Sequence, residues 1–241
     1  IRTKKGKNSI QTTKLTVLAK SLKPLPIVKY KDGVAYDKFD DPELRYRQRY
    51  VDLVVNDGVK ETFLKRSTII KTMRAVLDEA GYTEVETPIL QSIPGGASAR
   101  PFITHHNSLD MDLYLRSATE LYLKRLIVGG FEGVYEIGKN FRNEGMDKSH
   151  NPEFTCMELY VQYKDYNWMM DFTEKMLERI CIAVNGCPET TIDGKTISFK
   201  APYRRLPILD AIKEKTGYDL NGKSEDEIRD ICKALNMEID D

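Results

Sequence analysis

The order of apolar and polar positions predicts helices in several parts of the chain. Apolar residues at helical spacing predict a long helix over about 59–80. Its apolar face would carry Phe63, Ile70, Met73 and Leu77. Similar patterns predict helices over 119–128, 167–184, 209–215 and 224–235. An earlier helix would begin with Asp41 as N-cap and Pro42 at its first position, and would continue to Leu53.

Other stretches alternate apolar and polar residues or are rich in β-branched side chains, which is typical of strands. The predicted strands cover 9–13, 14–18, 83–87, 101–104, 111–116, 133–137, 139–142 and 153–163. The last two would face each other across the polar loop 143–152. Pro24 and Pro26 interrupt the pattern, because proline fixes φ and restricts the residue before it. We therefore expect a domain boundary and an extended linker at this point.

Composition narrows the class of protein. The 241 residues include 37 basic and 37 acidic side chains, so the formal net charge is zero, and 41% of the residues are hydrophobic. This is typical of a folded globular protein and argues against one that binds polyanions through bulk positive charge. No apolar run reaches the roughly 20 residues that span a membrane. The four cysteines form no C-x-x-C pair, so we expect free thiols in a reducing cytoplasm.

The densest group of polar residues lies in and beside the loop 143–152. Arg142 ends a predicted strand, Glu144 comes two residues later, and His150, Asn151 and Phe154 follow. An arginine can bind phosphate oxygens with paired hydrogen bonds, and an aromatic ring opposite a cation can stack on a flat base. The order of these residues favours a nucleotide site. Residue types alone would favour the alternative, a polar hairpin whose loop is only solvated.

Several stretches resemble the class II aminoacyl-tRNA synthetases. Residues 141–144 (FRNE) and 150–155 (HNPEFT) resemble motif 2 of that family, and 81–88 (GYTEVETP) resembles motif 1. Further stretches are similar to the bacterial lysyl-tRNA synthetase branch of class IIb: 45–53 (RYRQRYVDL), 93–97 (IPGGA), 100–107 (RPFITHHN) and 120–126 (ELYLKRL). The stretch 118–123 (ATELYL) is not shared with the aspartyl and asparaginyl relatives. The resemblance covers nearly the whole chain and its motifs are highly specific.

The resemblance implies an α+β fold, with an antiparallel sheet flanked by helices as the catalytic core, preceded by the last strands of an OB-fold β-barrel. Residues 1–23 would be a remnant of the anticodon-binding OB domain, 24–41 a linker, and 42–241 a catalytic domain incomplete at its C-terminus. Motif 3 and the carboxylates that hold Mg²⁺ would lie beyond Asp241. No metal ligand is therefore expected within this chain, and the chain alone would be inactive.

The resemblance also implies roles for single residues. Arg142 would be catalytic, holding the α-phosphate of ATP and the carboxylate of the amino acid. Glu144 would bind the adenine amino group and Phe154 would stack on adenine. His150 and Asn151 would lie near the triphosphate and the adenine. The residues that bind lysine would be Gly96, Glu120, Glu158 and Tyr160.

These roles imply ATP-dependent activation of lysine and its transfer to tRNA(Lys) in the cytoplasm, without a membrane. A substrate with two amino groups needs at least two carboxylates to offset its desolvation. Strand alternation puts Cys156, Glu158 and Tyr160 on one face, which is either exposed or part of a polar pocket. Motif 1 forms a homodimer interface in this family, so Pro88 and the 59–80 helix would make dimer contacts. An internal core helix is the alternative.

Two other functions fit parts of the sequence. A ligase that lysylates elongation factor P lacks an OB domain, and the strands predicted before Lys23 count against it. A non-catalytic binding module derived from a synthetase would suit the absence of motif 3. His105 and His106 would point to opposite faces of a strand, so we expect no metal site there. We expect the arginines over 45–49 to cover an apolar surface and pair with carboxylates rather than bind nucleic acid.

Overall fold

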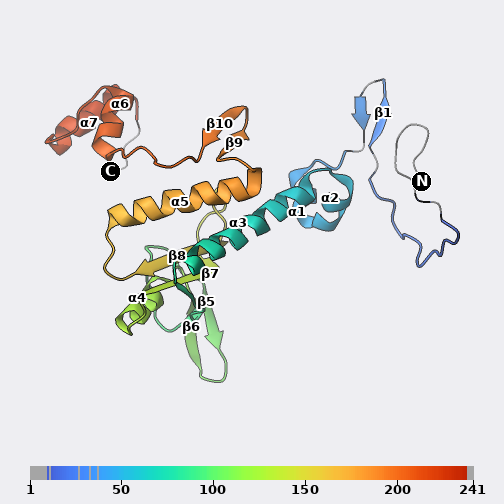
Figure 1. Cartoon of the computed structure of the whole chain (residues 1–241), viewed down its shortest axis with the longest axis horizontal. Coiled ribbons are helices and arrows are strands. Elements are labelled where there is room, and N and C mark those ends of the chain that lie inside the picture. Colours follow the sequence, from blue (N-terminus) through green and yellow to red (C-terminus); the bar gives the residue numbers. More distant parts are fainter. Residues whose placement is uncertain (1–9, 11, 27, 33, 37, 238–241) are drawn as a thin grey trace. The chain divides into compact units, whose positions relative to one another are not determined.

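The computed structural model describes residues 10, 12–26, 28–32, 34–36 and 38–237, and it divides into two compact units, residues 1–67 and 68–241 (Figure 1). In the first unit, β1 (Lys29–Lys31) and β2 (Val34–Tyr36) form an antiparallel hairpin. Short helices α1 (Pro42–Arg47) and α2 (Arg49–Val55) follow, and α3 (Val59–Glu79) begins in this unit. The hairpin was not expected, because its strands are only three residues long.

The predicted helix over 42–53 is wrong in one respect, because it breaks at Gln48 into α1 and α2. Its start is confirmed, since the side chain of Asp41 accepts a hydrogen bond from the Leu44 N–H at 2.8 Å. The break lets Arg45 reach Asp52, with 2.8 Å between Nε and Oδ1. Seven residues along a continuous helix would separate their backbones by about 10 Å. The burial of Asp52 therefore favours two short helices over one long helix.

The strands predicted over 9–13 and 14–18 are not found in the described residues 10 and 12–18. Leu15 and Leu18 are 83% and 94% exposed, and no strand of the described chain pairs with this stretch. A strand becomes stable when neighbouring strands accept its hydrogen bonds and one face is buried. β-Branched residues alone did not supply those partners. The OB-fold remnant therefore stays a prediction.

The second unit contains a sheet of three strands in the order β3 (Thr83–Glu84), β7 (Gly133–Phe141) and β8 (Glu153–Val161). β7 and β8 are antiparallel over their whole length, whereas β3 runs parallel to β7. The prediction of a purely antiparallel sheet is thus corrected to a mixed sheet. A parallel pair needs a crossover connection, and the long segment 85–132 supplies it. The strands predicted over 133–137 and 139–142 are one strand.

A second sheet in this unit is fully antiparallel, in the order β4 (Leu90–Gln91), β6 (Met111–Leu115) and β5 (Ile103–His106). It confirms the hairpin predicted around residues 107–110. The remaining elements are α4 (Glu120–Val128), α5 (Tyr166–Asn185), β9 (Glu189–Ile192), β10 (Lys195–Ser198), α6 (Ile208–Thr216) and α7 (Glu225–Ala234). All four predicted helices after residue 118 are thus present, with ends shifted by at most one residue.

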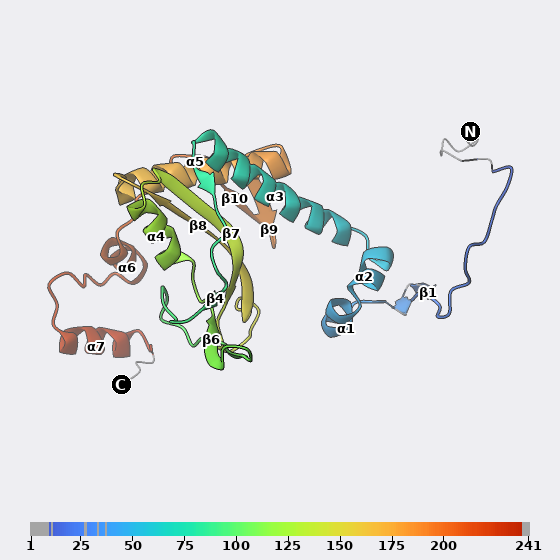
Figure 2. The same ribbon diagram turned by 90° about the horizontal axis from the view of Figure 1, so that it is seen from below.

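The two faces of the β7–β8 pair pack against different elements. α5 and the C-terminal part of α3 cover one face, whereas α4 and the β5–β6 hairpin lie on the other side (Figures 1 and 2). Tyr135 points to the helix side, where its hydroxyl donates to Asp78 of α3 at 2.7 Å. Val134 and Leu123 of α4 are fully buried on the other side. This second face also carries the residues of the candidate site.

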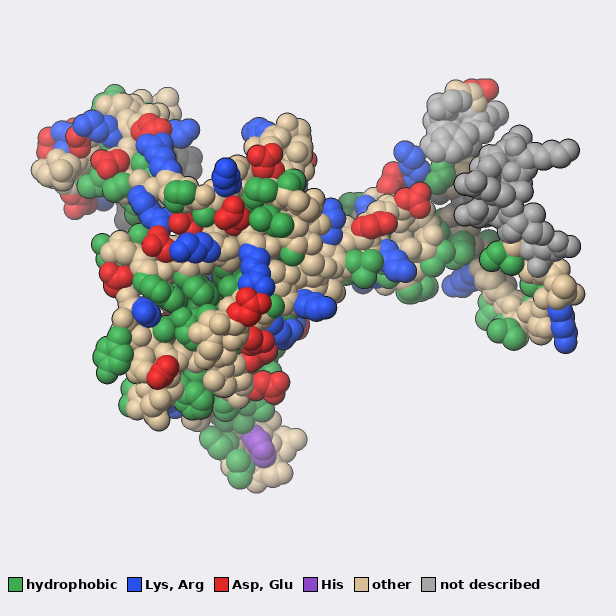
Figure 3. Space-filling model, viewed as in Figure 1, with side chains coloured by type: hydrophobic (Ala, Val, Ile, Leu, Met, Phe, Trp, Pro, Cys, Tyr) green, Lys and Arg blue, Asp and Glu red, His purple; other side chains and the backbone are tan. Residues whose placement is uncertain are grey.

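The surface of the second unit is strongly charged. Acidic and basic side chains are interspersed over α5 in the space-filling view (Figure 3). An example is the ion pair between Arg179 of α5 and Glu79 of α3, which holds the pKa of Glu79 below its usual range. Among the described residues, no helix has both the length and the apolar character needed to cross a membrane.

Candidate functional site

The residues predicted to bind ATP line one cavity of about 240 Å³ at the open end of the β7–β8 hairpin. The lining consists of Arg142, Glu144, Gly145, Ser149, His150, Asn151 and Phe154. Arg142 directly follows β7 and Phe154 is the second residue of β8. The Arg142 N–H donates to the Pro152 carbonyl at 2.8 Å and closes the base of the loop. The hairpin therefore brings together residues that stand up to twelve positions apart.

Arg142 is the cation of this cavity. Its guanidinium lies over the Phe154 ring, 5.1 Å from the ring centroid. It forms no ion pair with any carboxylate in the described part of the chain, and its Nε is buried without a hydrogen-bond partner. A buried donor without a partner costs free energy, so an arginine in this state favours binding an anion. Because Arg142 covers one face of the Phe154 ring, the other face of that ring can stack on a planar group.

The loop of the cavity is held by its own backbone and by Arg100. The Asn143 N–H donates to the Arg100 carbonyl at 2.8 Å, and the Arg100 N–H donates to Glu144 Oε1 at 3.3 Å. Sequence reasoning missed Arg100 because it acts through its backbone, which any residue type could supply. The loop position of Glu144 thus depends on a segment more than forty residues earlier in the chain.

Asp147 holds His150 at the cavity. One Asp147 oxygen accepts the Ser149 N–H at 2.6 Å and the His150 N–H at 2.8 Å, and the carboxylate contacts His150 Nδ1 at 2.8 Å. The Ser149 hydrogen bond and then the imidazole hold the pKa of Asp147 below its usual range. Asp147 was missed as a site residue. Its position three residues before a histidine in a turn was the available signal.

The residues predicted to bind lysine form a second group, centred on Glu158. Glu158 Oε1 accepts the Thr119 N–H at 3.3 Å, and Oε2 accepts the Tyr160 hydroxyl at 3.0 Å. Burial, followed by the Glu158 charge, raises the pKa of Tyr160 well above its usual range. The face of β8 that carries Glu158 is therefore polar and partly buried, and not an open solvent face.

Glu120 and Gly96, two further residues predicted to bind lysine, lie next to each other. A Cβ atom at Gly96 would stand 3.4 Å from the Glu120 Cβ and 3.1 Å from the Ala118 Cβ, and the φ of Gly96 is +84°. Both the close approach and the backbone conformation favour glycine. Glu120 pairs with Lys124 at 2.5 Å, and Lys124 Nζ lies 5.7 Å from the centroid of the Tyr160 ring. Lys124, which sequence reasoning missed, thus places an ammonium group beside the predicted ammonium pocket.

The two groups of residues are continuous along β8. Phe154, Cys156, Glu158 and Tyr160 alternate along the strand and therefore share one face. Phe154 and Glu158 are about 13 Å apart at the usual rise per residue. Between them, burial and then the Glu158 charge raise the pKa of the Cys156 thiol. One strand face thus joins a cationic, aromatic end to an anionic end.

Three further sequence features can be located. Pro88 is exposed and lies between β3 and β4, and nothing in the structure tests its predicted dimer contact. His105 Nδ1 lies 3.0 Å from Asp112 and its Nε2 lies 3.3 Å from Asp110, in the β5–β6 hairpin. The described residues contain no group of three or more His, Cys, Asp or Glu side chains arranged to hold a metal ion.

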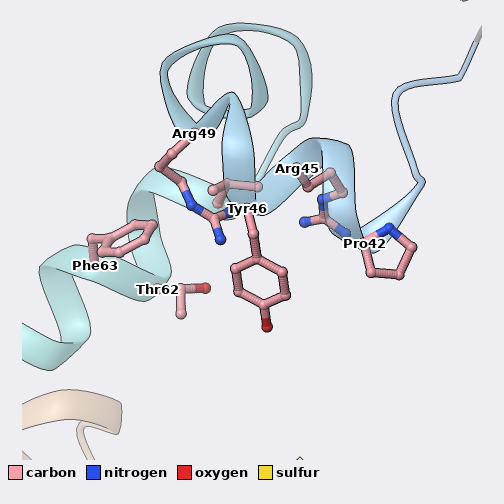
Figure 4. Close-up of a pocket in the computed structure, with 7 residues that line it drawn as sticks. Pro42, Arg45, Tyr46, Arg49, Thr62 and Phe63 are labelled. Atoms are coloured by element: carbon pink, nitrogen blue, oxygen red, sulfur yellow. The ribbon is translucent and has the colours of Figure 1, made fainter. Parts of the chain in front are cut away.

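A second cavity, of about 250 Å³, lies in the first unit (Figure 4). Arg45, Arg49, Tyr46 and Phe63 form its walls, together with Pro42, Val59 and Thr62. Arg49 lies between two aromatic rings, 5.1 Å from the Tyr46 centroid and 5.4 Å from that of Phe63. Both arginines form ion pairs with Asp52, which is fully buried. The expectation that these arginines pair with carboxylates is confirmed.

Comparison with known proteins gives consistent matches. The family described as tRNA synthetases class II (D, K and N) matches residues 41–235. The chain is 62% identical over 237 residues to a lysine–tRNA ligase of Porphyromonas gingivalis. It is 61% identical to the lysine–tRNA ligase of Azobacteroides pseudotrichonymphae and 59% identical to that of Christiangramia forsetii. These matches cover 98%, 99% and 100% of this chain, but only 41%, 48% and 42% of the relatives, so the chain spans less than half of their length.

Proposed function

This chain belongs to the class II tRNA synthetases of the D, K and N type, and we propose that it forms part of an enzyme that activates lysine with ATP and transfers it to tRNA(Lys). One observation carries this proposal. Arg142, a cation without a carboxylate partner among the described residues, lines a cavity with the other predicted ATP-binding residues. The same strand face continues to the Glu158–Tyr160 pair. The names of the relatives agree with it.

The proposed first step needs little covalent chemistry from the protein. A carboxylate oxygen of lysine attacks the α-phosphorus of ATP, a new oxygen–phosphorus bond forms, and the bond to the β-phosphate breaks and releases pyrophosphate. Arg142 would donate to the α-phosphate oxygens, where negative charge accumulates in the transition state. Its stacking on Phe154 fixes the guanidinium before ATP arrives. Lysyl-adenylate then passes its acyl group to the terminal adenosine of the tRNA, and AMP leaves.

Specificity for lysine would follow from the anionic end of the site. Glu158 is fixed by Thr119 and Tyr160 and would accept the side-chain ammonium, while Glu120 and the backbone at Gly96 would meet the α-amino group. Aspartate would be rejected by charge repulsion. Leucine would be rejected because it leaves the partly buried Glu158 carboxylate without a cationic partner. Lys124 now pairs with Glu120, and it would have to share that carboxylate with the substrate.

Mg²⁺ is part of the proposal but not of the site described above. The described residues offer no cluster of acidic side chains that fits the ion. Its ligands, like motif 3, are expected C-terminal to Asp241. We likewise propose a cytoplasmic enzyme, a homodimer that uses Pro88 and α3, and an OB-fold anticodon domain preceding residue 24. Exposed Ile89 beside Pro88 supports an interface in the second unit.

The assay that tests the proposed function is lysine-dependent exchange of pyrophosphate into ATP, measured on the complete enzyme that contains this chain. We expect exchange with lysine and none with aspartate or asparagine. Exchange with either of those amino acids instead would contradict the proposed specificity. Absence of exchange with every amino acid would favour a non-catalytic binding module. Charging of tRNA(Lys), compared with lysylation of elongation factor P, separates the two ligase activities.

A single substitution tests the ammonium pocket. Glu158→Gln keeps the shape of the side chain but removes its charge, so we expect lysine to bind about 10- to 100-fold more weakly, with little change for ATP. Isothermal titration calorimetry with each ligand measures both affinities. Glu153→Gln is the matched control, because Glu153 lies on the same strand but pairs with exposed Lys139. An equal loss of affinity for lysine and ATP in Glu158→Gln would rule out the proposed role.

A further inference from the structure

Arg116, which follows β6 directly, is buried beside the site. It is only 2% exposed, and its Nη1 donates to Glu136 Oε1 of β7 at 2.6 Å. Glu136 stands opposite Glu158 in the register of β7 and β8, so the two side chains share a face of the sheet. The guanidinium of Arg116 occupies the space above Gly138, which stands opposite Cys156. Arg116 therefore lies on the same face as the candidate site.

The first consequence of this position concerns the end of β7. The Arg116 carbonyl accepts the Phe141 N–H at 2.9 Å, and the Arg116 Nε donates to the Lys139 carbonyl at 2.9 Å. The backbone and the side chain of Arg116 thus both hold the last residues of β7 in place. Arg142 is the next residue along the chain. Arg116 thus fixes the end of β7, and with it the position of the Arg142 backbone.

The second consequence concerns the anionic end of the site. Only a short segment separates Arg116 from Thr119, whose N–H holds Glu158, and from Glu120. Ser117, Ala118 and Thr119 are all buried, so this segment has little freedom to move. Fixing Arg116 therefore also fixes the residues that orient the Glu158 carboxylate. Arg116 therefore contacts the segments that position both Arg142 and Glu158.

The network around Arg116 is closed by Thr87. Arg116 Nη1 donates to the Thr87 carbonyl at 3.0 Å, and the Thr87 hydroxyl donates to Glu136 Oε2 at 2.6 Å. The Thr87 N–H donates to the same oxygen at 3.2 Å. A buried ion pair is weak evidence for stability, because its desolvation offsets much of the attraction. Its directional hydrogen bonds, however, define one geometry where an apolar pair would allow several.

We propose that Arg116 is a positioning residue that sets the separation between the phosphate-binding Arg142 and the ammonium-binding Glu158. The inference rests on the proposed function and deepens it. Each half of the site keeps its own contacts when Arg116 changes, because neither Arg142 nor Glu158 is hydrogen-bonded to the Arg116 side chain. What changes is the alignment of two bound substrates. Alignment affects the rate of their reaction more than the binding of either one.

Arg116→Lys is the first test, carried out on the complete enzyme. The lysine keeps the buried charge but cannot bond Lys139, Thr87 and Glu136 together. We expect kcat for lysine-dependent exchange to fall about 10- to 100-fold, the range that misplacement by up to 1 Å produces. The calorimetric dissociation constants of ATP and lysine should change much less. Exchange kinetics and calorimetry on the same preparation measure the two effects.

Arg205→Lys is a control for changing an arginine that pairs with a buried carboxylate outside the site. Arg205 bonds Glu174, which is 4% exposed, at 2.8 Å, and neither residue contributes to the site. It should lower the melting temperature without changing kcat in the folded enzyme. Wild-type kcat in folded Arg116→Lys, or weakened binding of ATP or lysine that accounts for the whole loss, would overturn the proposal.

Gly138→Ala is a second variant that keeps every charge. The new methyl group would stand 2.4 Å from Arg116 Nη2, so the guanidinium would have to shift. We expect a fall in kcat like that of Arg116→Lys, and an unchanged kcat would overturn the proposal even if Arg116→Lys failed to fold. If the wild-type enzyme shows no lysine-dependent exchange, the proposed function fails and not the role of Arg116 alone.

Discussion

The two units each contain a cavity in which an arginine lies over an aromatic ring. The cavities have volumes of about 250 and 240 Å³, and in both a guanidinium stands 5.1 Å from a ring centroid, over Tyr46 in the first unit and over Phe154 in the second. Size and residue types therefore do not distinguish them. What differs is the counter-charge that each cavity provides for its arginine.

In the first unit the arginines are already neutralised. Asp52 is fully buried and accepts bonds from Arg45, Arg49 and Asn56. The Asn56 hydrogen bond, and then the two arginines, hold the pKa of Asp52 below its usual range despite its burial. In the second unit Arg142 has no such carboxylate in the described chain, and its Nε has no partner. The arginines of the first cavity thus stabilise the fold through Asp52, whereas the second cavity is suited to bind an anion.

The largest expected effect follows from removing the unpaired arginine. Arg142→Ala should lower kcat/KM for lysine-dependent pyrophosphate exchange about 10²- to 10³-fold, because it removes a preorganised donor to the transition state. The melting temperature should change little, since no ion pair is broken. Arg45→Ala is the control from the other cavity, and it should lower the melting temperature and keep the exchange activity. The reverse result in these two variants would refute the distinction between the cavities.

Asp52→Asn tests the structural cavity directly. The amide leaves two arginines without their shared carboxylate, so we expect a fall in melting temperature of several degrees at neutral pH. The low pKa of folded Asp52 means that its charge stabilises the protein above the unfolded pKa of about 3.9, and that this contribution is lost as pH falls through the folded value.

The pH dependence of stability tests the role of the Asp52 charge independently in the same variant. Thermal unfolding between about pH 3 and pH 7 should show that Asp52→Asn destabilises most at neutral pH, with the difference from wild type shrinking in acid. Asp165→Asn, which keeps an oxygen that can accept the Trp168 N–H and removes only an exposed charge, is a control with a smaller expected effect. A constant difference across this pH range would mean that the charge of Asp52 does not stabilise the first unit.

Local patterns predicted the long helix and the hairpin of the candidate site well. The helix predicted over 59–80 is α3 (Val59–Glu79), and the predicted ATP-binding residues Arg142, Glu144, His150 and Phe154 line one cavity. Both depend on residues that lie close together in the sequence. Helical spacing, hairpin loops and short motifs can all be detected within short stretches of sequence.

Features that depend on distant partners were not predictable. The β-branched, partly alternating residues 14–18 indicated a strand, but a strand needs a neighbour, and none of the described chain supplies it. Arg116 meets Glu136 twenty residues later and Thr87 twenty-nine residues earlier. Arg100 acts only through its backbone. No local pattern marks such residues, and the resemblance to a family implied roles only in substrate binding and in a dimer interface.

The smallest expected effect concerns the aromatic rings themselves. Phe154→Leu keeps an apolar side chain but removes the flat face, so ATP should bind about tenfold more weakly, since stacking on a base contributes about 1–3 kcal/mol. Tyr46→Leu makes the equivalent change beside Arg49 and should leave ATP affinity unchanged. Calorimetric titration of both variants with ATP measures this. If Tyr46→Leu weakened ATP binding as much as Phe154→Leu, an arginine–aromatic pair would be enough to recruit a nucleotide, and a buried counter-charge such as Asp52 would not distinguish structural cavities from binding sites.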